Sequence, residues 1–345
     1  MSTATKYICL KCKGTSFARY STFWECDECK AHYVCFKGMP KLFLEADIGD
    51  KDKSLRDYFY NGLLGKFYQF LMPFLTLPAR PFKISRKDWM IYLFSVAVIA
   101  GVTIGTVRFI VELVLHSRFD LFGAVSLVLL AAIVNFFAKH PYFFYLFLLA
   151  IPVKISLSKD KYQPAQSFRA VHDKYLEKFI GVRDRKLQVL DISTGTGNSL
   201  FRHGWMKLNA EYTGLDLSET MLAQCQQFMT KQQVPIDLVI GDAANLPFGD
   251  RVFDIVMNYG AINGYSDIRK ALAEMRRVVK PGGLMLFLDE QLYEQASGLE
   301  KLYFRKVLSS HNVIHKCPVD MLPSNSGAVN VYQVYEFYYI CACSV

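Results

Sequence analysis

The chain has 345 residues, enough for more than one module with its own core. Hydrophobic residues make up 52% of it and the mean hydropathy is +0.16, which argues against a purely soluble protein and indicates a concentrated apolar region. The net charge of +9 suits either nucleic acid or an anionic membrane surface. The first residues show no secretory signal pattern, so the nine cysteines favour metal binding in a reducing compartment over disulfides.

Two C-x-x-C pairs stand near the beginning of the chain, Cys9 with Cys12 and Cys26 with Cys29. This spacing predicts two hairpin tips that converge on one tetrahedral zinc ion. Four thiolates leave no open position for water, so the zinc is expected to be structural. We interpret the nearby His32 and Cys35 as packing residues rather than ligands.

The stretch from Cys29 to Phe43, with its Gly38-Met-Pro40 turn, resembles the small zinc-ribbon activator subunits of tRNA and release-factor methyltransferases. The resemblance covers about the first 45 residues. It leaves open a protein partner, or a homo-oligomer, bound through the ribbon.

Two uncharged apolar runs follow, Met90 to Val107 and Leu121 to Ala138. Each is long enough for a membrane-spanning helix, and the short link predicts a transmembrane helical hairpin. Basic residues on both flanks predict that the ribbon and the rest of the chain face the cytosol, which makes the protein an integral membrane protein in contact with membrane lipids. A pair of buried helices is the alternative.

Two shorter apolar and aromatic segments, Tyr58 to Leu77 and Tyr142 to Val153, are expected to lie in the membrane interface. A third span at Tyr142 to Val153 stays open.

From about Gln163 the pattern changes to alternating amphipathic helices and short apolar strands, typical of a parallel sheet covered on both faces. Leu187 to Ile192 is the first predicted strand and leads into Ser193-Thr-Gly-Thr-Gly197. A second strand ends at Asp216, an acid suited to ribose hydroxyls, and Ser218 caps the next helix. Two further strands lead to Asp242 and to Asn258, and all four loops are expected to meet at one ligand.

At these residues the chain resembles class I S-adenosylmethionine-dependent methyltransferases, in the branch of the ubiquinone and menaquinone C-methyltransferases. The resemblance implies a Rossmann-like domain with a seven-stranded, mostly parallel sheet. It implies that Asp191, Ser193, Gly195 and Gly197 surround the methionine end of the cofactor and that Asp216 holds its ribose. The other implied contacts are Leu217 and Met221 on the adenine, Asp242 and Ala243 at its amino edge, and Asn258 and Tyr259 beside the methyl group.

Two alternatives compete with this interpretation. The first is a nicotinamide-binding fold. Its dinucleotide-binding motif has a third glycine at the position that Leu200 occupies in this chain, which argues against that fold. The second is a catalytically inactive methyltransferase domain. The presence of every acidic residue that the cofactor needs argues against it.

Candidates for a catalytic base near the methyl group are Tyr259, Asn263, Glu290 and His203, with Tyr265 beside them. Asn258-Tyr-Gly-Ala261 lacks the Asn/Asp-Pro-Pro-Tyr/Phe motif, so nucleic acid is not expected as a partner. A lipid-like small molecule, such as an isoprenoid quinone precursor or another prenylated or acylated ring, is the predicted acceptor. The alternative is a membrane-tethered adaptor, or a protein or RNA methyltransferase, in which the ribbon recruits a partner.

The predicted organisation is therefore an α/β enzyme with two additions, a small zinc ribbon and a two-helix transmembrane hairpin. Its parts are the ribbon (1–46), a linker with an interfacial segment (47–88), the hairpin (89–138), an interfacial segment and linker (139–162), and the methyltransferase domain (163–345).

Overall fold

The computed structural model describes residues 6–66, 86–116, 121–139, 149, 153, 168–182, 184–308, 315–334 and 337–345. The chain divides into two compact units. One comprises residues 1–72, 164–293 and 315–345, and the other comprises residues 73–163 and 294–314. Most of the predicted interfacial segments, 67–77 and 142–153 except 149 and 153, lie outside the described residues.

The first unit begins with a four-stranded antiparallel sheet, in the order β1-β2-β3-β4. Its strands are β1 (Phe17–Arg19), β2 (Phe23–Cys26), β3 (His32–Phe36) and β4 (Met39–Pro40). Short helical turns follow: η1 (Glu45–Asp47), α1 (Asp50–Ser54), the π-helix η2 (Leu55–Tyr60) and α2 (Leu63–Lys66).

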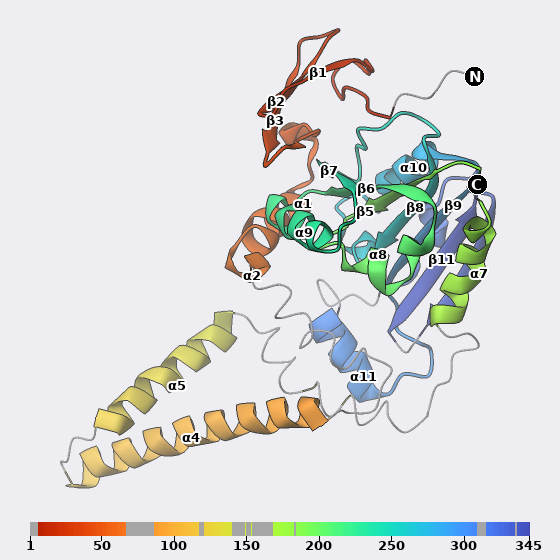
Figure 1. The fold of residues 1–345 in the computed structure, drawn as a ribbon. Helices are drawn as coiled ribbons and strands as arrows, with labels where there is room; N and C mark the ends of the chain where they lie inside the picture. The colour runs from red at the N-terminus through yellow and green to blue at the C-terminus, as the bar shows by residue number, and fades with distance from the viewer. Residues whose placement is uncertain are drawn as a thin grey trace. The chain divides into compact units, whose positions relative to one another are not determined.

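The rest of the first unit is built on a seven-stranded sheet in the order β10-β11-β9-β8-β5-β6-β7 (Figure 1). The five neighbouring strands β9, β8, β5, β6 and β7 run parallel, and β10 and β11 at the other edge are antiparallel, as the seven-stranded, mostly parallel prediction requires. The strands are β5 (Leu187–Ile192), β6 (Ala210–Asp216), β7 (Ile236–Ile240), β8 (Phe253–Tyr259), β9 (Val279–Glu290), β10 (Ala328–Val334) and β11 (Tyr338–Ser344). The helical segments are α7 (Phe168–Ile180), α8 (Asn198–Arg202), η3 (Trp205–Lys207), α9 (Glu219–Lys231), η4 (Ile262–Gly264), α10 (Ile268–Val278) and η7 (Val319–Met321).

Both faces of this sheet are buried, because side chains alternate along each strand. Leu190 and Ile192 of β5 join one apolar cluster with α10, whereas Leu187 and Val189 join the other cluster with α7, α8 and α9. Helices therefore cover both faces, and the polar strand ends of β5, β6, β7 and β8 meet at one edge.

The second unit contains α4 (Arg86–His116), α5 (Leu121–Lys139), α11 (Gly298–Tyr303) and the π-helix η5 (Phe304–Leu308). The two apolar runs do form helices, and α4 and α5 pack on each other where glycines allow close approach. A Cβ at Gly105 would lie 2.6 Å from Ser126 Oγ, and one at Gly123 would lie 2.2 Å from Phe109 Cβ.

Within the described ranges, none of the helices combines the length and the apolar character that crossing a bilayer requires. The predicted transmembrane hairpin is therefore not supported, and the predicted localisation as an integral membrane protein is wrong.

Candidate functional site

A pocket lies at the carboxyl edge of the parallel strands, where the four predicted loops meet. Seven of the eleven predicted cofactor residues line it: Ser193, Asp216, Leu217, Met221, Asp242, Ala243 and Tyr259. The other four, Asp191, Gly195, Gly197 and Asn258, do not line it. Six further residues of this domain do, and sequence reasoning gave them no cofactor role: Ser218, Gly241, Gly260, Ala261, Gly264 and Tyr265.

Asp216 organises the centre of the pocket. Its Oδ2 accepts a hydrogen bond from the Gly195 backbone N–H at 2.9 Å, and its Oδ1 accepts one from the Ser218 N–H at 2.9 Å. Burial raises the pKa of this carboxyl group, and the backbone hydrogen bonds oppose the rise. Ser218 in turn accepts from the Met221 N–H at 3.2 Å, so it caps α9 as predicted.

Gly195 and Gly197, in the loop after β5, meet different structural requirements. Both have positive φ angles, 55° at Gly195 and 77° at Gly197. A Cβ at Gly195 would meet nothing closer than 4.0 Å, which leaves its backbone open to a ligand. A Cβ at Gly197 would lie 2.6 Å from Met229 Cε and 2.8 Å from Cys225 Sγ, so this glycine serves the packing of α9.

Beneath the pocket, two buried acceptor atoms on neighbouring strands lack a partner among the described residues, Oδ1 of Asp191 and Oδ1 of Asn258. The other oxygen of Asp191 accepts from Thr194 Oγ1 at 2.6 Å. Burial raises the pKa of Asp191 to about 7, against the hydrogen bonds from Thr194 and Ser199. Asn258 donates to the Ile192 carbonyl at 3.0 Å and to the Tyr265 hydroxyl at 2.7 Å.

Of the four candidate bases, Tyr259 lines the pocket, whereas Asn263, Glu290 and His203 are not among its lining residues. The Tyr259 hydroxyl accepts from Trp205 Nε1 at 2.7 Å and lies 2.8 Å from Nε2 of the buried His172, while His203 stacks against the rings of His172 and Tyr259. Burial raises the pKa of Tyr259 well above its usual value and lowers that of His172 to about 4. Tyr259 is therefore protonated and His172 neutral at pH 7.

Asn263 and Glu290 form the other part of this group. The Asn263 side-chain amide donates to the Glu290 carbonyl oxygen at 2.8 Å, and its backbone N–H donates to Asp289 at 2.7 Å. Burial and the neighbouring Asp289 raise the pKa of the Glu290 carboxyl group well above its usual value. The shift disfavours the charged form of Glu290, which a general base needs.

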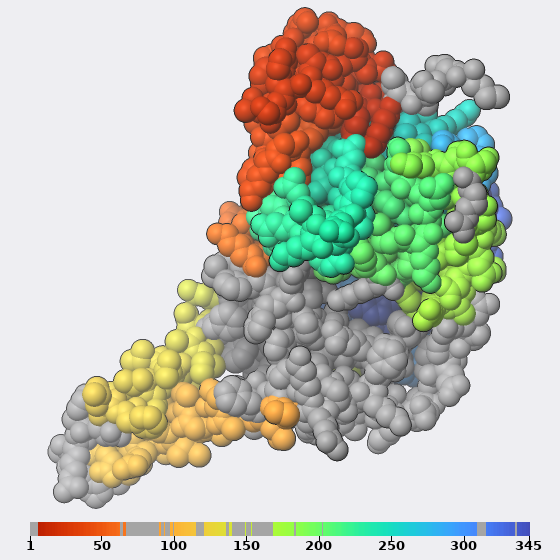
Figure 2. Space-filling model, in the orientation of Figure 1, coloured from red at the N-terminus to blue at the C-terminus, as the bar shows by residue number. Residues whose placement is uncertain are grey.

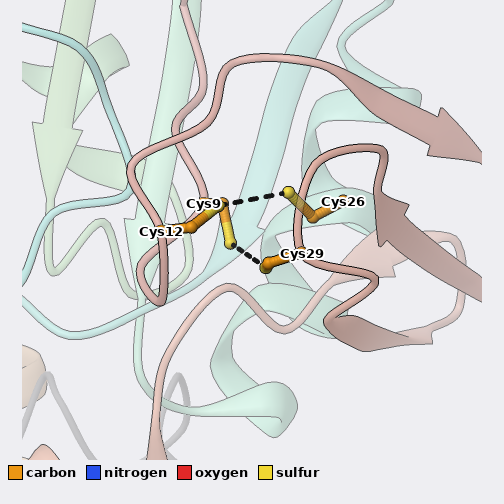
Figure 3. A group of neighbouring side chains, drawn as sticks. All are labelled: Cys9, Cys12, Cys26 and Cys29. Atoms are coloured by element: carbon orange, nitrogen blue, oxygen red, sulfur yellow. Dashed lines mark hydrogen bonds between the residues drawn. The ribbon is translucent and has the colours of Figure 1, made fainter.

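The predicted metal ligands converge (Figure 3). The Sγ atoms of Cys9, Cys12, Cys26 and Cys29 all lie within 4.8 Å of one another. His32 instead pairs with Glu25 at 2.6 Å and stacks on Phe23, and Cys35 packs against the apolar core, so neither belongs to the cysteine cluster.

Comparisons with known proteins agree with this geometry. Residues 190–287 match the family model described as "Methyltransferase domain". Over 103 residues the chain is 40% identical to a phthiotriol/phenolphthiotriol dimycocerosates methyltransferase of Mycobacterium tuberculosis, covering 30% of this chain and 37% of the relative. It is 37% identical over 127 residues to a demethylmenaquinone methyltransferase of Staphylococcus haemolyticus, covering 35% and 52%.

Among solved structures, the chain is similar to a Haemonchus contortus phosphoethanolamine N-methyltransferase in complex with S-adenosylhomocysteine. The identity is 16% and the TM-score 0.41, with 50% of this chain and 52% of that chain covered. The chain thus spans between a third and about half of the length of these relatives. The sequence matches show that it carries an S-adenosylmethionine-dependent methyltransferase domain.

Proposed function

We propose that this protein transfers a methyl group from S-adenosylmethionine to a lipid-like small molecule. The observation that carries the proposal is the pocket at the strand ends, where two carboxylates, Asp216 and Asp242, stand beside the apolar Leu217 and Met221. Carboxylates suit the ribose hydroxyls and the adenine amino group, and the apolar side chains suit the faces of a purine ring.

The unpartnered acceptors of Asp191 and Asn258 support the orientation of the cofactor. An ammonium group is the partner that such buried oxygens would favour, and the methionine end of S-adenosylmethionine carries one. We therefore place the methionine end toward β5 and β8. The open space at Gly195 fits the same placement.

One part of the pocket wall is uncharged. It is formed by Tyr259, Gly260, Ala261, Gly264 and Tyr265. Small and aromatic residues suit an apolar, ring-bearing acceptor better than a charged metabolite. The names of the mycobacterial and staphylococcal relatives, which refer to phthiotriol dimycocerosates and demethylmenaquinone, support the same class.

When bound, S-adenosylmethionine supplies an electrophilic methyl group on a sulfonium. The residues of this chain then have to hold the acceptor in line and keep water out. We propose that Tyr259 and its partners Trp205, His172 and His203 form a rigid wall for this purpose, because the Tyr259 hydroxyl is already engaged by hydrogen bonds. Asn263 and Glu290 would orient the acceptor by hydrogen bonds.

The test uses purified protein, labelled S-adenosylmethionine and a cellular extract containing lipids, protein and RNA. We expect the label to enter the organic phase, and a reaction with Asp216→Ala protein serves as the control for the background. Label in protein or RNA alone would contradict the lipid-like acceptor and favour the ribbon-recruited alternative.

We also propose that the four cysteines bind one structural zinc ion, because four thiolates at this spacing form a closed tetrahedral site. Metal analysis is expected to find about one zinc per chain, and the double replacement Cys26→Ser/Cys29→Ser should remove it. Cys35→Ser is the matched control, since Cys35 lies on the adjoining strand β3 outside the cluster. A wild-type protein that folds without metal would contradict this proposal.

A further inference from the structure

The cofactor pocket has a wall that does not come from the methyltransferase domain. Asp52, Leu55, Arg56 and Tyr60 line it, and they belong to α1 and η2. We call residues 45–61 the cap. The cap directly follows the ribbon in the chain, so the contacts of the ribbon decide where the cap can lie.

The ribbon is docked on its own methyltransferase domain (Figure 2). The Ile8 N–H donates to the Pro247 carbonyl at 3.0 Å, and the Gly249 N–H donates to the Lys6 carbonyl at 3.2 Å. Between these two bonds the buried Tyr7 ring packs on Phe248, 5.4 Å between centroids. Tyr7, Cys9, Trp24 and Tyr33 therefore share one apolar cluster with strands β5 and β8 and helix α10.

A second contact ties the ribbon to a pocket loop. The Leu42 N–H donates to the Ile240 carbonyl at 2.8 Å, and Lys41 pairs in parallel with Ile240, so the chain after β4 extends the sheet beyond its edge strand β7. Lys41 also forms an ion pair with Glu219. The residues directly after Ile240 are Gly241, Asp242 and Ala243, which line the pocket.

The cap itself rests on two other pocket loops. The Asp52 carboxylate accepts from the Ser266 N–H at 3.2 Å, and the Asp52 N–H donates to Ser266 Oγ at 3.3 Å. At the other end, Asn61 Oδ1 accepts from Ser218 Oγ at 2.7 Å and from the Thr220 N–H at 3.3 Å. Ser266 follows the pocket residue Tyr265, and Ser218 follows Leu217.

Arg56 connects η2 to Glu45, the first residue of the cap, which directly follows the ribbon. Its guanidinium donates two hydrogen bonds to the Glu45 carboxylate, at 2.7 and 3.0 Å, and two to Asp57, at 2.7 and 3.1 Å. The Arg56 side chain is only 12% exposed and lies 6.0 Å from the centroid of the Phe43 ring. The N–H groups of Arg56 already donate to two carboxylates within the cap. Arg56 therefore acts by positioning η2 rather than by binding the cofactor.

We propose that the ribbon and the cap together form the outer wall of the cofactor pocket, with Arg56 as the positioning residue, so that metal binding and cofactor binding stabilise each other. This inference rests on the proposed function, because it concerns the same cofactor. A metal ion held by the four cysteines would order the ribbon, the ordered ribbon would fix the cap, and the cap would form part of the wall around S-adenosylmethionine. Such a coupling is reciprocal by linkage.

The test measures the dissociation constant of S-adenosylmethionine by calorimetry on the full chain. We expect Arg56→Ala and Cys26→Ser/Cys29→Ser each to weaken binding about tenfold, a typical size for coupling between sites. Arg56→Lys should recover part of the loss, because a lysine still pairs with Glu45 or Asp57. Val34→Ala is the matched control, since Val34 is 60% exposed on strand β3 of the ribbon.

The combined variant gives the decisive result. If both changes act through the cap, the combined loss equals about the larger single loss rather than the product of the two. Hydrogen exchange should also show faster exchange of the amides of residues 50–61 in both variants. Unchanged affinity in folded Arg56→Ala protein, or losses that multiply, would overturn the inference.

The outcomes also separate this inference from the proposed function. A wild-type protein that fails to bind S-adenosylmethionine removes the proposed function itself. A wild type that binds it, with cap variants that bind equally well, removes only the coupling. If the cysteine variant does not fold, Arg56→Ala and Arg56→Lys decide the matter by their affinities and by amide exchange in the cap.

Discussion

Replacing Asp216 by alanine is expected to abolish measurable binding of S-adenosylmethionine. The carboxylate faces the pocket, where we propose that it accepts hydrogen bonds from the ribose, and it also holds the N–H groups of Gly195 and Ser218. Each hydrogen bond to a charged group contributes roughly 1.5 to 3 kcal/mol, so losing two ligand bonds weakens binding by at least about 100-fold. Calorimetry with S-adenosylmethionine and S-adenosylhomocysteine measures the loss.

Glu211→Ala is the control for this experiment. Glu211 lies in the same strand β6, but it is exposed and pairs only with Lys186 and Gln188 at the far end from the pocket. Its replacement should leave the affinity unchanged. The circular dichroism spectrum of Asp216→Ala protein should match that of the wild type, and a folded variant that still binds would contradict the ribose contact.

The strand-end residues could be predicted from sequence because each lies next to a local signal. Asp191 and Asp216 lie at the carboxyl ends of two apolar strands, and parallel strands bring these ends to one edge. The cysteine cluster was equally local, since two C-x-x-C pairs specify it. Such patterns need no knowledge of long-range packing.

The cap could not be predicted in this way. Asp52 and Ser266 are 214 positions apart, and Asn61 and Ser218 are 157 apart, so no spacing rule connects them. The aromatic residues from Tyr58 onward also imitate an interfacial segment, and only the structure shows Tyr60 at the pocket. The contact between cap and loops is set by the docking of the ribbon, which is a property of the folded chain.

For the predicted transmembrane hairpin, composition predicted the helices but not their surroundings. Apolar composition correctly predicted two helices at α4 and α5, because both runs are continuous and free of proline. Composition could not determine what surrounds those helices. A membrane-spanning helix must be both long enough and continuously apolar. None of the described helices meets both requirements.

Replacing Asp191 by asparagine is expected to raise the stability of the cofactor-free protein while lowering its affinity for the cofactor. Burial raises the pKa of Asp191 to about 7, whereas an aspartate in an unfolded chain has a pKa of about 3.9. Between these values the folded protein keeps a proton that the unfolded chain has released. The free energy of unfolding therefore falls as the pH rises from about 4 to about 7, and this contribution is then constant.

The size of this effect follows from the gap between the two pKa values. About three pH units correspond to on the order of 4 kcal/mol as an upper limit. Asparagine does not titrate, so the variant should lack this slope and be the more stable protein at pH 8. Urea unfolding of both proteins at pH 5 and pH 8 measures the difference, with the exposed Asp184→Asn as a control that keeps the wild-type slope.

Cofactor affinity should change in the opposite direction. If the ionised Asp191 faces the ammonium group of S-adenosylmethionine, wild-type affinity rises as the pH increases through about 7, because the carboxylate then carries its charge. The asparagine variant should bind at least about tenfold more weakly at pH 8 and lack that rise. Equal affinities at pH 8 would place the methionine end elsewhere. Parallel stability curves for wild type and variant would instead mean that Asp191 does not titrate near neutrality.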